Sequence, residues 1–246
     1  MENFMADKKM DLSRMLFHGL HFGCSDEEGY LEQMVLEKIL MCGEILPKER
    51  LCEVLTEEEF WQLQLTKTDL DWNKNDCVSL AQQGDTYNDL NSYAVWRNDY
   101  AFYIYCARHT SIIISREILD DFNSECYGID KLHKDRKNEF MNGEIQVKRS
   151  VPKKYFRGIS YYQYYHNSYI EKLINEGKLN CEVINDLLKL AEDDWLKKYY
   201  SKQIMIEKLL EKYGYNMGIY DSQTGNQFPS IKEEKEIIRS LKMQCK

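Results

Sequence analysis

Three short segments place residues capable of chemistry beside apolar runs. Met15-Leu-Phe-His-Gly19 delivers a histidine and a glycine after three apolar residues. Val78-Ser-Leu-Ala81 carries a serine in a β-prone run, and Glu144-Ile-Gln-Val-Lys148 begins with a carboxylate and then alternates apolar and polar residues. A histidine at a strand end is often a surface residue before a turn, and Glu144 by itself fits an exposed edge strand. A joint role for these three segments therefore depends on whether the fold brings them together.

The order of the segments resembles that of the ADP-ribosyltransferase superfamily, the fold of diphtheria toxin and the poly(ADP-ribose) polymerases. Leu16-Phe-His-Gly19 is similar to the first family motif, and Val78-Ser-Leu-Ala81 stands where the family has its second. Asn142-Gly-Glu-Ile-Gln-Val147 resembles the strand that carries the family's glutamate, and Glu37–Gly43 resembles its "IL…G" segment. The resemblance covers roughly residues 14–160 and leaves the remainder unexplained.

The resemblance implies an NAD-dependent mono-ADP-ribosyltransferase, a glycosyltransferase with NAD as co-substrate and no metal. Cleavage of the nicotinamide–ribose bond passes through an oxocarbenium-like state, and a carboxylate beside the developing positive charge stabilises it. The family pattern gives this catalytic role to Glu144. It has His18 bind a ribose hydroxyl on the adenosine side, while Gly19, which has no Cβ, leaves room for the carboxamide of nicotinamide.

The second motif departs from the family pattern. One branch of the family stacks a tyrosine on the nicotinamide ring from this strand, but here the matching residue is Ser79. A serine is typical of another branch, whose first motif has an arginine in place of His18. A stacking ring must then come from elsewhere, since any flat aromatic face suits a pyridinium. We expect Tyr93 to supply it from a helix beside the pocket, with Tyr87 and Tyr100 as alternatives.

The acceptor of the ADP-ribose stays open. Asn142, two positions before the glutamate, is expected on the acceptor side, where its amide can bind an acceptor but cannot deprotonate one. The expected partner is a macromolecule, either protein or nucleic acid. Alternatives are a catalytically silent interaction protein, an NAD hydrolase, and an RNA 2′-phosphotransferase. The last is disfavoured because Cys77–Ala81 holds neither the arginines nor the histidine that this activity requires.

The elements that must position these residues form an α+β pattern. Capping boxes at Ser25–Glu28 and Thr56–Glu59 predict the starts of two helices, and Gly43 is expected to end the first of them. Ile112-Ile-Ile114 predicts a strand that is buried on both faces. Strands are expected at residues 15–19, 77–81, 101–106, 111–115, 144–148 and 159–165.

The second part of the chain has a different texture. From residue 169 the apolar side chains follow helical spacing, which Tyr213-Gly-Tyr-Asn216 interrupts before a last charged helix over residues 230–245. The sequence therefore predicts an ADP-ribosyltransferase-like domain with a split β-sheet core at residues 1–166. A helical extension at 167–246 is expected to follow and to offer a surface for a partner.

Composition limits the function classes. The net charge is −8, with −11 in the first 150 residues and +3 in the rest, which disfavours a general nucleic-acid binder. Eight cysteines without a CxxC pair indicate reduced thiols rather than disulfides or a zinc site. No run of 18 apolar residues and no secretory signal is visible. A cytoplasmic protein is expected, with a toxin or effector role conceivable.

Overall fold

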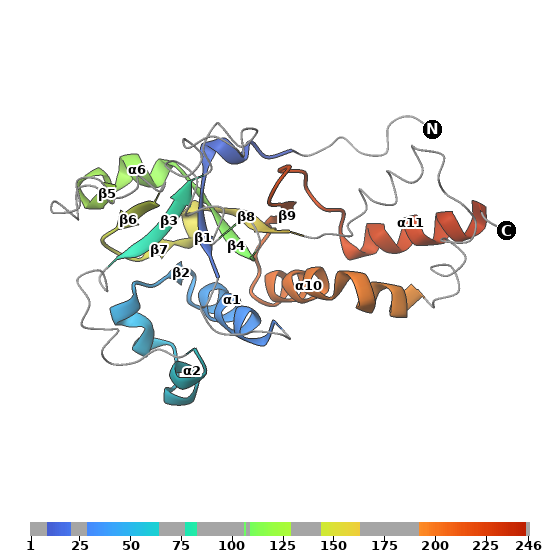
Figure 1. Ribbon diagram of the computed structural model, residues 1–246, viewed down its shortest axis with the longest axis horizontal. Coiled ribbons are helices and arrows are strands. Elements are labelled where there is room, and N and C mark those ends of the chain that lie inside the picture. Colours follow the sequence, from blue (N-terminus) through green and yellow to red (C-terminus); the bar gives the residue numbers. More distant parts are fainter. Residues whose placement is uncertain are drawn as a thin grey trace, which may run out of the picture.

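The computed structural model describes residues 9–20, 29–63, 77–82, 106, 109–128, 144–162 and 192–244. In this part the chain has a mixed α/β fold around one seven-stranded sheet (Figure 1). Its strand order is β5-β6-β3-β1-β4-β8-β9, and each neighbouring pair is antiparallel except β8 and β9. The strands are β1 (Met15–Gly19), β3 (Val78–Gln82), β4 (Ser111–Ser115), β5 (Cys126–Gly128), β6 (Glu144–Val147), β8 (Phe156–Tyr161) and β9 (Gly218–Asp221).

Helices and short turns surround this sheet. A second, two-stranded sheet joins β2 (Glu44–Ile45) to β7 (Val151–Pro152). The α-helices are α1 (Tyr30–Cys42), α2 (Glu57–Gln62), α6 (Glu117–Asp121), α10 (Glu192–Lys212) and α11 (Ile231–Gln244). The 3-10 helices are η1 (Leu12–Arg14), η2 (Lys48–Glu53), η3 (Asn123–Glu125) and η4 (Lys153–Tyr155). No described helix is long and apolar enough to cross a bilayer.

Strand β4, which lies inside the sheet between β1 and β8, divides the core into two clusters. All five of its residues are buried, as the run of three isoleucines predicts. Ile112 and Ile114 belong to the larger cluster, which includes side chains from helices α1 and α10, such as Leu36 and Ile206. Ile113 packs on the other face with a smaller cluster, whose other buried members are Leu12, Phe17, Ala81 and Cys106. Burial on both faces explains why this strand carries no charged residue.

Two of the predicted helix ends are confirmed in detail. Gly43 ends α1 with a φ of 74°, and its N–H donates to the Ile39 carbonyl. Thr56 and Glu59 form the predicted capping box at the start of α2: the Glu59 N–H donates to Thr56 Oγ1 at 3.2 Å, and the Thr56 N–H donates to Glu59 Oε2 at 2.7 Å. The box predicted at Ser25–Glu28 lies outside the described residues.

The C-terminal segment differs from the predicted helical extension. It contains helices α10 and α11, but it also supplies β9, which pairs with β8 in parallel. Parallel neighbours need a long crossover connection, and α10 lies in that crossover, packed on α1 (Figure 1). Strand β9 was not predicted from the sequence, because its four residues begin with a glycine and follow a helix stop, a pattern that is typical of a loop. A purely helical extension at 167–246 is therefore not what the structure shows.

The outer side of β9 is covered by the chain itself. Residues 226–228 fold back along it, with the Asp221 N–H donating to the Asn226 carbonyl at 2.8 Å and the Phe228 N–H donating to the Ile219 carbonyl at 2.8 Å. Near the other end of the chain, the Met10 N–H donates to the Gly225 carbonyl at 2.9 Å. An N-terminal segment thus closes onto the C-terminal turn.

Two glycines let β8 and β9 share one aromatic cover. Gly158 pairs with Gly218, and the ring of Tyr220 lies over both. A Cβ on Gly158 would come within 2.6 Å of Tyr220 Cε2 and 2.9 Å of the Gly218 carbonyl oxygen. Glycine is required here for close approach.

We predict that Gly158→Ala lowers the free energy of unfolding by about 2 kcal/mol, because an added methyl group overpacks this site. Urea denaturation would measure the loss. The control is Gly214→Ala, where nothing lies within 4 Å of an added Cβ and only the positive φ opposes it, at a cost of about 1 kcal/mol. An equal or smaller loss for Gly158→Ala would contradict the packing of β9 in the sheet.

Candidate functional site

The sheet brings the three chemistry-bearing segments onto neighbouring strands. His18 and Gly19 end β1, Ser79 lies in β3, and Glu144 begins β6, with β3 between the other two strands. Neighbouring strands lie about 4.8 Å apart, so a separation of 126 positions in sequence becomes two strand spacings, about 10 Å. Strand β3, which carries Ser79, thus lies between β1 and β6 and pairs with both.

The register fixes which positions share a row across the sheet. Ala81 pairs with Phe17 on one side and with Glu144 on the other. Ser79 pairs with Gln146. Because side chains alternate along a strand, this pair lies on the same face as the pair of Ala81 and Glu144, two residues away along each strand. Ser79 is exposed and Gln146 is fully buried. The side chain of Glu144 lies outside the described part, so its place is given by the backbone alone.

His18 does not belong to this row. It follows Phe17 and pairs with Ile112 on β4, so strand alternation assigns it to the opposite face from the row of Phe17 and Ala81. The printed pairing of β1 with β3 reaches only Leu16 and Phe17. At the strand end the backbone of His18 lies beyond the described pairs with β3, but its imidazole contacts the main chain of β3.

The contact of His18 defines its protonation. Its Nδ1 lies 3.0 Å from the Ser79 carbonyl oxygen, and since a carbonyl only accepts, Nδ1 carries the proton. Burial lowers the pKa of His18 below its ordinary 6.5, and the bond to the Ser79 carbonyl opposes this in part. At neutral pH the ring is therefore neutral, with Nε2 as an acceptor for a hydroxyl group.

Gly19 and its surroundings form the end of β1. Gly19 pairs with Ser111, and it is not among the described glycines with positive φ. Its main-chain amide contacts the buried thiol of Cys106, whose pKa burial raises to about 12. The next residue, Leu20, donates its N–H to the Thr110 carbonyl at 2.9 Å. The strand end is thus held by main-chain contacts with the segment before β4.

The remaining predicted site residues cannot be placed. Tyr93, which was expected to stack on nicotinamide, lies outside the described residues, as do Tyr87 and Tyr100. Asn142, expected on the acceptor side, also lies outside them. Their roles remain predictions from the sequence.

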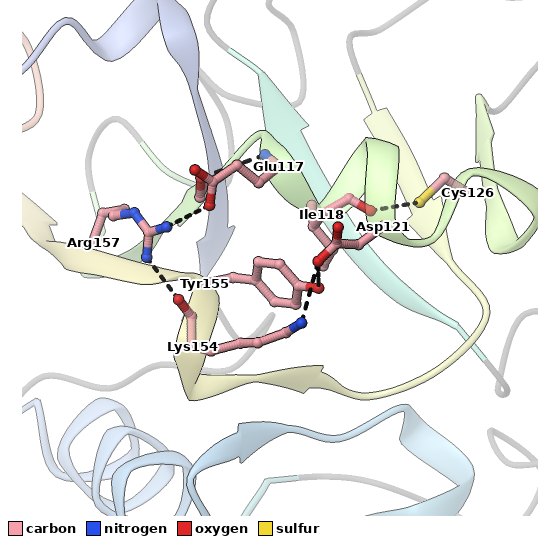
Figure 2. A network of polar contacts seen from close by, with 8 residues as sticks. Glu117, Ile118, Asp121, Cys126, Lys154, Tyr155 and Arg157 are labelled. Carbon is pink, nitrogen blue, oxygen red and sulfur yellow. Dashed lines mark hydrogen bonds and ion pairs between the residues drawn. The ribbon is translucent and has the colours of Figure 1, made fainter.

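A polar network that sequence reasoning missed fixes the turn after β6 and β7 (Figure 2). The hydroxyl of Tyr155 donates to Asp121 Oδ2 at 2.5 Å, and Lys154 Nζ lies 3.2 Å from the same oxygen. Arg157 pairs with Glu117 at 2.7 Å. The bond from Tyr155 is the main reason that the pKa of Asp121 lies below its usual value, with Lys154 adding to it.

This network follows the end of β4 that pairs with Met15, opposite the end that pairs with Gly19. It joins helix α6, which follows β4, to η4, which precedes β8 (Figure 2). It also pairs Lys154 and Arg157, two of the basic residues between positions 148 and 157, with carboxylates. Exposed ion pairs contribute little each, but the buried ring of Tyr155 anchors the turn in the core. The sequence feature that could have indicated this network is the pair of acidic residues at positions 117 and 121, which lie one helical turn apart in α6.

The described residues show no metal centre. No group of three or more histidine, cysteine, aspartate or glutamate side chains among them is arranged to hold a metal ion. The described cysteines, at positions 42, 52, 77, 106 and 126, are free thiols. What the described part offers for chemistry is thus a neutral imidazole, main-chain groups at one strand end, and a neighbouring strand that begins with a glutamate.

Comparisons with known proteins add no relative. No family model matches the chain, and no curated protein and no solved structure gives a significant match.

We predict that the protein loses stability as the pH falls below 6.5. The unfolded chain takes up a proton on His18 near pH 6.5, whereas burial lowers the pKa of His18 in the folded chain, so protonation favours unfolding. An NMR titration of the ring protons should give a midpoint below 6.5. The His18→Asn variant should lose this part of the pH dependence, and a midpoint above 6.5 would contradict the desolvation that lowers the pKa of His18.

Proposed function

We propose that this protein is an NAD-dependent mono-ADP-ribosyltransferase, with an ADP-ribosyltransferase-like fold around strands β1, β3 and β6. The observation that carries the proposal is the adjacency of these strands, which are the three that hold the family-like motifs. A chance match of three short motifs would have no reason to fall on neighbouring strands. The acceptor would be a protein or a nucleic acid, and the reaction would take place in the cytoplasm.

The chemistry assigns a task to each residue. The bond between ribose C1′ and the nicotinamide nitrogen breaks, and its electron pair leaves with nicotinamide. A nucleophile of the acceptor then attacks C1′ and gives its proton to Glu144 or to solvent. Glu144, at the start of β6, would stabilise the positive charge that develops on the ribose and align the acceptor. Nicotinamide is a good leaving group, so no strong general acid is needed.

His18 suits the binding role better than an acid–base role. Its proton is held on Nδ1 by the Ser79 carbonyl, so Nε2 is left to accept a hydroxyl of the adenosine ribose. Because burial lowers the pKa of His18, the ring stays neutral and does not repel the cationic nicotinamide ring. Ser79, exposed on the next strand, would bind the carboxamide.

Two observations favour the second candidate, a catalytically silent protein that keeps this fold for binding. The amide of Gly19 already contacts Cys106, which limits what it can offer to a carboxamide. Strand alternation also assigns His18 and the row of Glu144 to opposite faces. If the protein is an enzyme, the imidazole of His18 must therefore contact the bound NAD past the end of β3, from the opposite face of the sheet. An activity assay separates the two candidates.

We predict that Glu144→Gln reduces nicotinamide release and label transfer from NAD by about 100- to 1000-fold, the cost of losing one electrostatic contact to a transition state. The assay incubates purified protein with labelled NAD and cell extract. Labelled acceptor would indicate transfer, whereas free ADP-ribose alone would indicate an NAD hydrolase.

The matched control is Glu125→Gln, the same change next to the neighbouring strand β5. Glu125 pairs with Arg149 at 3.5 Å on the surface, so its loss should leave activity unchanged. Equal activity in wild type and Glu144→Gln would remove Glu144 from the mechanism. Absence of nicotinamide release under all conditions would support the silent protein.

We also predict that His18→Ala weakens NAD binding about tenfold, which corresponds to one hydrogen bond. Isothermal titration calorimetry would measure the change in the dissociation constant. In His18→Gln a side-chain amide can still accept a hydroxyl, so partial recovery is expected. Unchanged affinity in His18→Ala would place the dinucleotide elsewhere.

A further inference from the structure

A buried carboxylate on helix α1 has no task in the proposed mechanism. Glu32 is only 8% exposed, and burying a carboxylate is costly unless its charge is paired and hydrogen-bonded. Its Oε1 accepts the N–H of Thr110 at 2.7 Å, and its Oε2 lies 2.8 Å from Lys202 Nζ on helix α10. Each oxygen thus has a partner from a different part of the chain.

The bond to Thr110 leads to the end of β1. Thr110 stands just before β4, whose pairing with β1 begins at Ser111 and Gly19. Its N–H goes to Glu32, and its carbonyl accepts the N–H of Leu20 at 2.9 Å. A chain of hydrogen bonds therefore runs from Lys202 through Glu32 and Thr110 to Leu20.

We infer that Glu32 is a positioning residue, whose carboxylate fixes the end of β1 through the main chain of Thr110. Leu20 is two residues from His18 and directly follows Gly19, so an error in its position displaces both. A displacement of about 1 Å in a binding group can cost about 100-fold in rate. The consequence for NAD rests on the proposed function, whereas the placement of the strand end does not.

The ion pair adds a link to the C-terminal part of the chain. Lys202 is about one-third exposed, so it neutralises Glu32 while its own end remains near solvent. It also lies 5.9 Å from the centre of the Tyr161 ring at the end of β8. Helix α10, which the sequence suggested only as a surface for a partner, thereby contributes to the setting of β1.

The test compares Glu32→Ala and Glu32→Gln in the full chain by amide hydrogen exchange at Leu20. Glu32→Ala should speed this exchange about tenfold, because the Thr110 N–H loses its acceptor. In Glu32→Gln the amide oxygen can still accept that N–H, so exchange should stay within about threefold of wild type. Exchange at wild-type rate in Glu32→Ala, or equal rates in the two variants, would overturn the inference.

Two further variants separate positioning from general stability. Glu37→Ala removes a pair of α1 with Lys212 of the same helix α10, at 2.6 Å, but Glu37 does not contact Thr110. It should leave exchange at Leu20 unchanged. Thr110→Val removes a buried hydroxyl with no partner in the described part and keeps both main-chain bonds, so it should also leave exchange unchanged. Faster exchange in either variant would attribute the effect to loosening of the fold as a whole.

A second readout addresses the site itself. With NAD as the varied substrate, Glu32→Ala should raise KM about tenfold with a smaller change in kcat, and Glu32→Gln should recover most of the loss. If the wild-type chain neither binds nor cleaves NAD, the proposed function fails while the exchange result still decides the role of Glu32. If NAD is cleaved and Glu32→Ala has the wild-type KM, the role of Glu32 in the site fails by itself.

Discussion

The arrangement of this molecule depends on neutralising one negative charge inside it. A carboxylate at position 32 has left water, so it needs a cation and a donor close by. The cation comes from α10 and the donor from the segment before β4, which lie 170 and 78 positions further along the chain. Satisfying one side chain thus requires helix α1, the segment before β4 and helix α10 to meet at the same place.

Strand β4 supplies the second constraint. It lies between β1 and β8 and is buried on both faces, so other parts of the chain must cover each face. Helices α1 and α10 fill one face. The segment near Leu12 and the side chain of Cys106 contribute to the other. The candidate site includes the end of β1, where Gly19 pairs with Ser111 at the start of β4.

Sequence analysis predicted the local features well because they depend on a few adjacent residues. The run of three isoleucines, the capping box at Thr56 and the terminal Gly43 each carry their own physical reason. Strand β9 was missed because its pairing depends on residues some 60 positions away. The partners of Tyr155 were missed for the same reason, since a tyrosine beside two lysines reads as surface and its burial depends on α6.

The site shows the same division. The sequence placed His18, Ser79 and Glu144 on strands, and the sheet has these strands as neighbours. Which residues share a face could not be predicted, since a shift of one residue in register exchanges the two faces of a strand. The hydrogen bond between the ring of His18 and Ser79 could not be predicted either, because it depends on where the pairing of β1 and β3 ends.

The closure of the chain onto the outer side of β9 has a consequence for solubility. A bare edge strand presents unpaired donors and acceptors that another molecule can pair with, which promotes aggregation. Here residues 226–228 occupy those groups, and the backbone of Met10 braces their turn through Gly225. Proteolytic removal of the segment around Met10 would loosen that brace and promote intermolecular β-pairing at this edge.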